Sequence, residues 1–567
     1  MSLSSIIGAA GSALTASQSR IAVANLNVAN ADDATYTRKT VTSAVSTTTQ
    51  SLSNATILRV ADAYLSKTVL KTAAAAGGDA VTDNYLQSYD AALGSTATGD
   101  DVSSLVSAFQ TALTALSSSV DATSKAQLVS DASDLAQGIK SLSGEVQALR
   151  TQANTQIETT VGTINQTLKS LASLNDQIAT VTAQGGDTTS LEDQRDAALT
   201  TLSGLMGVSS YVTADNQLRV YTTGGDALLG TTAATLSYTA SSQLGAGATY
   251  PGSISGILLN GKDITASQTA GELGALVTLR DQSLPAQQDQ LDQLAGALIA
   301  QVNAVTNTGT SVPAPANLTS SGTVSASDAL SATGTLRVAV TDSAGKVVST
   351  QDLDLSSYAA VGDLVTALNG VSGLTAAIGS DGKLTIATTD SANGVALADD
   401  GAAISARFGF NDLFTGSTAS DIGVSARLAG DASGLPTAAL STTATLATGD
   451  LALASGDSTV ADALSSLLTT AVSFAATGSQ DAKTVSLASY ASGFVSQAAT
   501  LISTASTTSA ASTAANDAAV SRLQNLTAVN VDEELANITQ YQTQYEANAQ
   551  LISIAKELFE TLVNMVS

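Results

Sequence analysis

The distribution of proline constrains this chain more than any other feature of its sequence. All five prolines of the 567 residues lie in the middle of the chain, at Pro251, Pro285, Pro313, Pro315 and Pro436. Because a proline costs about 3 kcal/mol inside a helix, the two flanks without proline are free to form long helices. We therefore expect helices towards both ends of the chain and a different architecture between them.

Both ends carry apolar residues at helical spacing. In the opening segment they recur at alternating intervals of four and three, which predicts a helix about 40 Å long. The final segment repeats the pattern, and Asn530 ahead of Asp532–Glu534 predicts its start, because these side chains suit the positive end of a helix dipole. The stripe positions are Leu3, Ile7, Ala10, Leu14, Ser17, Ile21, Ala24 and Val28, then Val531, Leu535, Ile538, Gln542, Tyr545, Ala549, Ile552, Lys556, Phe559, Val563 and Val566.

A third apolar stripe runs from about Ser124 to Gln184. If continuous, it forms a helix of about 90 Å, which predicts a rod-like bundle. We expect its partners in Val102–Val120, Leu284–Val305 and a late helix from about Leu487 to Leu526. A bundle built from both ends of the chain brings those ends together, so the segments between them are inserts.

Two inserts contain strand and turn signals. Val208–Thr265 alternates apolar and polar residues, turns at Pro251-Gly252, and has a hairpin signal at Asn260-Gly261. The second insert follows a linker at Val312–Pro315 and ends near Pro436. Its order of hairpin, helix and hairpin predicts a small α+β domain.

The predicted fold is multidomain and mainly α with β inserts. It combines paired N- and C-terminal coiled-coil helices, a long-helix bundle, and an inserted small α+β outer domain. The predicted domains are residues 1–70 with 528–567, residues 71–312 with 437–527 including a β insert near 208–265, and residues 313–436.

Composition excludes several chemistries. The chain has no His, Cys or Trp, so we expect no imidazole-based or thiol-based catalysis, no zinc or haem site and no disulfide, and predict neither metal nor cofactor. Its net charge of -26 disfavours nucleic acid. We expect no membrane insertion, since strongly apolar runs of 18 residues are missing. The first basic residue is Arg20, so the opening lacks the positive region of a secretory signal.

Two short motifs resemble catalytic or binding patterns. Ser343–Lys346 matches Ser-x-x-Lys, but it stands between two strand-like runs and is interpreted as a β-turn. Gly245–Tyr250 begins like a dinucleotide loop, but Tyr250 occupies the position of the third glycine and Pro251 prevents the following helix. Neither motif predicts a site.

With His and Cys missing, paired carboxylates are the remaining groups that could act in catalysis, as they do in glycosidases. The candidates are Asp352 with Asp354, Asp399 with Asp400, and Glu533 with Glu534. We interpret them as solvated faces or as charges that suit a helix end. Around Asp399-Asp400 the alternating oxygen ligands of a calcium loop are missing.

The two ends resemble a known family. Residues 1–39, with Asn27-x-x-Asn30 followed by Tyr36-Thr37-Arg38, are similar to the N-terminal segment of flagellar rod, hook and hook-associated proteins. Val531–Glu534, Gln540–Gln542 and Tyr545–Ala549 resemble their C-terminal segment.

Interior elements resemble the members of this family that stand at the junction of hook and filament. These elements are Leu191–Asp196, Gly271–Leu276 with Leu279–Asp281, the hook-IN-like stretch Gly334–Leu397, and Phe408–Phe414. Two departures stand near the first helix. Leu26 replaces a usual asparagine, and Asp33-Ala34-Thr35 replaces the common Thr-Pro-Gly before Tyr36.

The resemblance implies a non-enzymatic structural subunit of the bacterial flagellum. It implies export through the flagellar secretion apparatus without a cleaved signal peptide, and an extracellular homo-oligomer placed on the hook protein and followed by hook-associated protein 3 and flagellin. It also implies a cytoplasmic export chaperone that binds the C-terminal helix. The terminal helices would form the inner tube, the bundle the next layer and the hook-IN-like domain the surface.

We expect assembly to depend on apolar side chains of the two terminal helices. These are Leu3, Ile7, Leu14, Ile21 and Val28 with Leu535, Ile538, Tyr545, Ile552, Phe559 and Val563. Arg20, Arg38 and Lys39 are expected to pair with acidic residues such as Asp532–Glu534, at about 1 kcal/mol or less for each exposed pair.

Three alternatives stay open at this point. One is a subunit like hook-associated protein 3 or flagellin. Another is a flagellum-attached polysaccharide hydrolase that uses paired carboxylates. The third gives the outer domain a passive or glycan-binding role.

Overall fold

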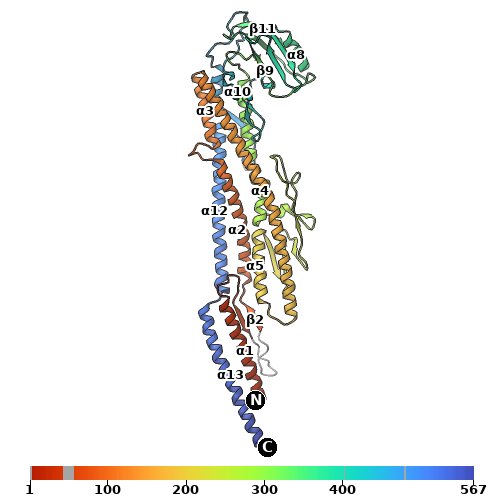
Figure 1. Ribbon diagram of the computed structural model, residues 1–567, viewed down its shortest axis with the longest axis vertical. Helices are drawn as coiled ribbons and strands as arrows, with labels where there is room; N and C mark the ends of the chain where they lie inside the picture. Colours follow the sequence, from red (N-terminus) through yellow and green to blue (C-terminus); the bar gives the residue numbers. More distant parts are fainter. Residues whose placement is uncertain (1–2, 43–55, 401–402, 478–479, 567) are drawn as a thin grey trace.

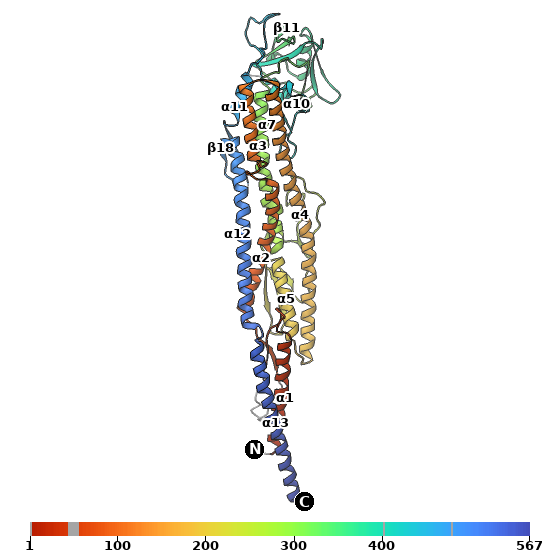
Figure 2. The ribbon, with the colours of Figure 1, turned by 60° about the vertical axis from the view of Figure 1, so that its left-hand side comes forward.

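The computed structural model describes residues 3–42, 56–400, 403–477 and 480–566. The molecule is a long rod with three parts (Figures 1 and 2). A pair of helices from the two ends of the chain lies at one end, long helices fill the middle, and a β-rich domain lies at the other end. The predicted fold class, mainly α with β inserts, is confirmed.

The terminal pair consists of α1 (Leu3–Ala29) and α13 (Val531–Val566). The two helices lie side by side and run in opposite directions (Figures 1 and 2). The backbone N–H of Glu533 donates to the Asn530 side chain at 3.2 Å, so the predicted start of α13 is confirmed. A two-stranded ribbon, β1 (Lys39–Thr42) and β2 (Thr56–Arg59), connects α1 to the rod.

The predicted long helix is one uninterrupted element, α4 (Ala122–Ala183). Its apolar stripe is buried, and the Asp121 carboxylate caps its first turn by accepting from the backbone N–H groups of Thr123 and Ser124. The other rod helices are α2 (Ala63–Leu93), α3 (Val102–Ser118), α5 (Thr189–Leu205), α6 (Gly271–Thr278), α7 (Leu284–Thr306), α11 (Thr459–Leu467) and α12 (Leu487–Thr527). The expected partners of α4 are thereby confirmed as helices.

Helices α6 and α7 are joined by a π-helical turn, Leu279–Ser283. Pro285 stands in the first turn of α7, where its missing N–H costs little. The helical path from α6 into α7 therefore continues past Pro285.

The first β insert carries two small antiparallel sheets. Its strands are β3 (Val208–Val212), β4 (Leu218–Thr222), β5 (Ala227–Leu229), β6 (Leu236–Ser237), β7 (Leu258–Leu259) and β8 (Lys262–Asp263), in the orders β3-β4-β5 and β6-β7-β8. Asn260 and Gly261 join β7 to β8 with φ of 49° and 86°, so the predicted hairpin is confirmed.

The outer domain contains two three-stranded sheets, ordered β11-β10-β14 and β12-β13-β9. Its elements are β9 (Asn317–Thr319), β10 (Thr335–Thr341), β11 (Val347–Asp354), α8 (Val361–Asn369), β12 (Leu374–Ile378), β13 (Leu384–Thr388) and β14 (Gly394–Asp400). The predicted order of hairpin, helix and hairpin is present, and β14 returns to pair with β10.

Short elements complete the chain. They are α9 (Ile404–Phe408), β15 (Phe414–Thr415), β16 (Gly423–Val424), α10 (Ala426–Gly430), β17 (Ala471–Phe474), β18 (Lys483–Ser486) and the 3-10 turns Thr265–Ser267, Leu355–Ser357 and Ala432–Gly434.

The predicted domain ranges stay a prediction, and the structure differs from them at two places. Residue 70 lies inside α2, which begins at Ala63. Residues 438–453, assigned to the bundle, pack on the outer domain, where Leu440 and Leu453 share a core cluster with Ala339 of β10 and Ala396 of β14.

Candidate assembly interface

Small side chains allow close packing where α1 faces α13. Ala10, Ser17, Ala24 and Asn27 of α1 are buried. The guanidinium of Arg20 lies 5.7 Å from the centre of the Tyr541 ring on α13. Arg20 therefore contacts an aromatic ring of α13 rather than the acidic residues predicted for it.

The predicted assembly residues fall into two groups. Half-buried side chains are those of Ile7, Leu14, Ile21, Val28, Ile538, Tyr545 and Ile552. Exposed side chains are those of Leu535, Phe559 and Val563. Leu3 begins α1, but its side chain lies outside the described residues. Their role in assembly stays a prediction.

The face of α13 that meets α1 differs from the predicted stripe. Its buried residues are Glu534 and Ala555, and its half-buried residues are Asn537, Ile538, Tyr541, Gln544, Tyr545, Asn548, Ala549 and Ile552. The predicted stripe shares only Ile538, Tyr545, Ala549 and Ile552 with this set. The difference arises because α13 carries apolar residues on more than one face.

A second row of apolar residues on α13 faces away from α1. Leu551, Ile554, Leu558, Leu562 and Met565, here called the outer stripe, are each about half exposed or more. Their spacing of three, four, four and three places them on one helical face. This spacing is visible in the sequence, so the outer stripe could have been predicted.

Among the described residues, the last turns of α13 also lack a partner on the side of α1. Helix α13 has 36 residues and α1 has 27, and α13 continues past the start of α1 (Figure 2). Phe559 and Val563 are 54% and 49% exposed. Two apolar surfaces of α13 are therefore open at this end of the rod.

Arg38 connects the two ends of the chain. Its guanidinium donates to Glu534 at 2.7 Å and to Glu533 at 2.9 Å. Burial lowers the pKa of Arg38, but the two glutamates outweigh burial and hold the pKa above its ordinary value. The predicted pairing is confirmed for Arg38. Lys39 also pairs with a carboxylate, but its partner is Asp193 of α5, at 3.7 Å, and not one of Asp532–Glu534.

The three carboxylate pairs do not form a catalytic arrangement. Asp352 is held by Arg337 at 2.7 Å, and Asp354 accepts from the backbone N–H of Ser356. Asp399 and Asp400 are neighbours on β14, where successive side chains point to opposite faces. Burial raises the pKa of Asp399.

Glu534 is buried, contrary to the expectation that these carboxylates lie on solvated faces. It is 3% exposed because it lies beneath Arg38 at the start of α13.

The Ser343–Lys346 motif is a turn, as predicted. The Asp342 carboxylate accepts from the backbone N–H groups of Ala344 and Lys346, and Gly345 has a φ of 77°. Gly245–Tyr250 lies in a loop, so no helix follows it to bind a phosphate.

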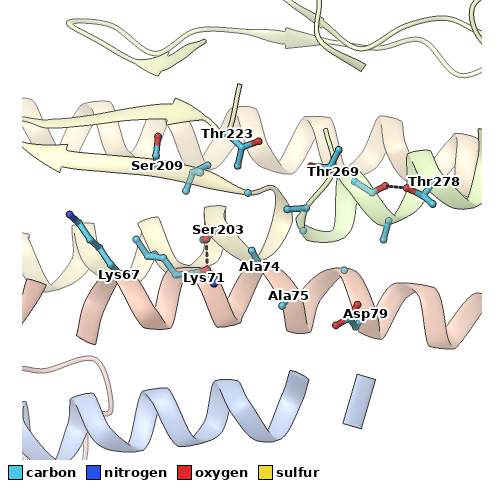
Figure 3. Close-up of a pocket in the computed structure, with 18 of the residues that line it drawn as sticks. Lys67, Lys71, Ala74, Ala75, Asp79, Ser203, Ser209, Thr223, Thr269 and Thr278 are labelled. Atoms are coloured by element: carbon cyan, nitrogen blue, oxygen red, sulfur yellow. Dashed lines mark hydrogen bonds between the residues drawn. The ribbon is translucent and has the colours of Figure 1, made fainter. Parts of the chain in front are cut away.

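A groove of about 780 Å³ lies between α2, the β3-β4 hairpin and α6 (Figure 3). Lys67 and Lys71 lie along the α2 side, and Asp79 is the one carboxylate among the described residues that line the groove. Asp79 accepts from Ser512, and the Ser203 hydroxyl donates to the carbonyl of Leu70. These contacts leave the groove without paired acid and base groups.

The described residues contain neither a cluster suited to a metal ion nor a helix suited to a membrane. No group of three or more acidic residues is arranged to hold a metal ion in the part of the chain that the structure describes. Within the same residues, every helix is either too short or too polar for a membrane crossing.

Comparison with known proteins shows which flagellar proteins the chain resembles. Residues 86–316 match the family described as the helical domain of flagellar hook-associated protein FlgK, and residues 525–565 match the C-terminal segment of the flagellar basal body rod FlgEFG proteins. Flagellar hook-associated protein 1 of Escherichia coli K12 is 26% identical over 312 residues, which cover 53% of this chain and 57% of the relative. The chain is therefore similar to flagellar hook-associated protein 1, and this similarity supports a flagellar hook-associated protein.

Two further proteins are similar to this chain. Flagellar hook-associated protein 1 of Salmonella typhimurium LT2 is 27% identical over 319 residues, which cover 53% of this chain and 56% of the relative. The solved structure of the flagellar hook junction protein FlgK from Burkholderia pseudomallei covers 80% of this chain and 99% of its own, with a TM-score of 0.49 and 18% identity. The chain thus matches little more than half the length of its curated relatives.

The similarity to these proteins indicates the general biological setting of the chain. The hook-associated protein 1 family consists of structural flagellar proteins and not of enzymes. The similarity to flagellar hook-associated proteins implies a place in the bacterial flagellum.

Proposed function

We propose that this chain is a structural subunit that joins the flagellar hook to the filament by self-assembly through α1 and α13. The observation that carries the proposal is the outer stripe of α13, five large apolar side chains left open at one end of a long rod. Contiguous exposed apolar surface marks an interaction site in a soluble protein.

The geometry of the terminal pair favours assembly between copies. Each large apolar side chain contributes about 1.5–3 kcal/mol when it becomes buried. The outer stripe, with Phe559 and Val563, offers seven such side chains on a helix that α1 covers along one face only. A neighbouring terminal pair has the matching shape and apolar character to cover them.

Ten of the eleven predicted assembly residues take one of two roles in this proposal; the side chain of Leu3 lies outside the described residues. Ile7, Leu14, Ile21, Val28, Ile538, Tyr545 and Ile552 stabilise the pair within one subunit. Leu535, Phe559 and Val563 face neighbouring copies. Their exposed fractions of 49% to 54% support this division.

The partners and the route are part of the same proposal. The chain would assemble on the hook protein and be followed by hook-associated protein 3, outside the cell, after export without a cleaved signal peptide. An export chaperone would bind the C-terminal helix beforehand, because an open apolar stripe favours aggregation of free subunits. The outer domain would lie at the surface of the junction.

Removal of α13 tests this proposal. A chain without Asn530–Ser567, expressed in cells that lack the full chain, should leave hooks without filaments in electron micrographs. The α12 end, Ser521–Ala528, is kept intact, and the secreted amount is measured in the medium. Hooks that carry filaments in the presence of this shortened chain would overturn the proposal.

A further inference from the structure

Four consecutive residues, Tyr36–Lys39, join the terminal pair to the rod. On the side of α1 they are held by Asn27, which is fully buried. The Asn27 amide nitrogen donates to the carbonyl of Lys39 at 2.9 Å, and its oxygen accepts from the Lys39 backbone N–H at 3.0 Å and from the Tyr36 hydroxyl at 2.9 Å. The end of α1 is therefore fixed to this segment.

On the side of the rod, the same segment converges on Asp193 of α5. The Thr37 hydroxyl donates to the Asp193 carboxylate at 2.6 Å, and the Lys39 ammonium lies 3.7 Å from it. The Lys39 side chain is 0% exposed and that of Asp193 is 6% exposed. Lys39 also donates to the Ser190 hydroxyl at 2.6 Å.

The second strand of the ribbon reaches the same turns of α5. Arg59 of β2 lies 2.8 Å from Glu192, 3.3 Å from Asp193 and 2.7 Å from Asp196. Three carboxylates of one helix thus meet two cations of the ribbon. We call Tyr36–Lys39, Arg59, Glu192, Asp193 and Asp196 the joint.

Arg38 extends the joint to the C-terminal half of the chain. Its backbone N–H donates to the carbonyl of Thr527, the last residue of α12, at 2.7 Å. Its side chain pairs with Glu533 and Glu534 of α13. The joint therefore contacts α1, α5, α12 and α13.

The apolar packing next to the joint is incomplete. A cavity of about 420 Å³ is lined by Tyr36, Thr37 and Asp193 on one side and by Leu199 of α5 and Leu523 of α12 on the other. The terminal pair continues from the end of the rod and does not lie along it (Figures 1 and 2). The buried polar contacts of the joint therefore lie where the pair leaves the rod.

We infer that Asp193 is a positioning residue for assembly, because it fixes the direction in which the α1–α13 pair leaves the rod. This inference rests on the proposed function. It gives a physical role to two elements that the sequence singled out, Tyr36-Thr37-Arg38 and Leu191–Asp196, which are the two halves of the joint. Charged and buried contacts suit this role, because removing one partner leaves the other uncompensated.

Distance measurements between spin labels test the inference in the full-length chain. The chain has no native cysteine, so Gln550→Cys on α13 and Ser170→Cys on α4 place one label on each side of the joint without further changes. Both positions are exposed and lie outside the joint. The experiment compares the parent pair with Asp193→Asn, and with Asp176→Asn as a matched control on the exposed face of α4.

We expect one narrow distance distribution in the parent and in Asp176→Asn, and a broadened or displaced distribution in Asp193→Asn. Thr37→Val, which removes only the hydroxyl that donates to Asp193, should shift the distribution in the same direction. If circular dichroism shows that Asp193→Asn does not form its helices, the distance distribution of Thr37→Val tests the inference instead.

An unchanged distribution in Asp193→Asn, or in Thr37→Val where that variant decides, would overturn the inference. So would equal broadening in the Asp176→Asn control. The distances are measured in dilute monomers, so they report on the joint even if the proposed junction function is wrong. Filament attachment in cells that carry Asp193→Asn, with α13 intact, then tests whether direction matters for assembly.

Discussion

The Nε atom of Arg38 lies 2.7 Å from Oε1 of Glu534, although the two residues are 496 positions apart in the chain. Glu534 is almost fully buried at the start of α13, and Arg38 follows α1. This ion pair connects the two ends of the chain, so its loss should destabilise the start of α13.

Replacement of the buried glutamate should loosen the first turns of α13. Glu534→Gln removes the charge that Arg38 meets at 2.7 Å, and a hydrogen bond to a charged group is worth about 2 kcal/mol. Hydrogen exchange of the amides of residues 531–540 should speed up accordingly. Glu533→Gln is the control: its side chain is 55% exposed, so an effect of about 1 kcal/mol or less is expected. Equal effects of both variants would contradict the assignment.

Acidic pH should lower the free energy of unfolding through Glu192, a residue of the joint. Burial alone would raise the pKa of Glu192, but hydrogen bonds from Asn216 and Thr188 and the charge of Arg59 lower it below its ordinary value of 4.5. Because the folded-state pKa lies below the unfolded one, this contribution to stability is complete above the unfolded pKa and is lost as pH falls through the folded pKa.

Denaturant unfolding between about pH 6 and pH 3 measures this dependence. The chain with Glu192→Gln should lose less stability over this interval than the parent. Parallel curves for the two proteins would show that Glu192 does not contribute as described.

Close packing of α2 on α5 depends on glycine. A Cβ atom at Gly77 would stand 2.5 Å from the carbonyl oxygen of Gly204. Gly77→Ala should therefore lower the free energy of unfolding by about 1–3 kcal/mol, because the backbone of α5 must move. In Gly162→Ala on α4, the added Cβ atom has no other atom within 4 Å. This variant should raise the free energy of unfolding by up to about 1 kcal/mol. Thermal unfolding of the two variants in parallel separates the effects, and a neutral Gly77→Ala would refute the close contact.

The long helices were predictable because their signals are local. The stripe through α4 repeats over many turns, and the helix has no break from Ala122 to Ala183. Asn260-Gly261 likewise predicts its hairpin from two residues, since their backbone adopts the left-handed conformation that the turn requires.

The contacts between distant segments were not predictable in the same way. The face of α13 that meets α1 is ambiguous in sequence, because both that face and the outer stripe are apolar. Burial of Glu534 depends on Arg38, and the true partner of Lys39 is Asp193 on α5. Such pairings are set by the way the rod brings its segments together, and the spacing of residues along one helix does not encode them.

Point variants in the outer stripe test the central claim most directly. Purified chain carrying Leu558→Gln and Leu562→Gln is added to cells whose hooks lack this subunit, so export plays no part. The control carries Glu557→Gln and Thr561→Gln, at exposed polar positions of the same turns. We predict that filaments grow on hooks supplied with the control and fail to grow on hooks supplied with the stripe variant, while circular dichroism of the two proteins agrees. Equal numbers of filaments with both proteins would contradict an assembly role for the outer stripe.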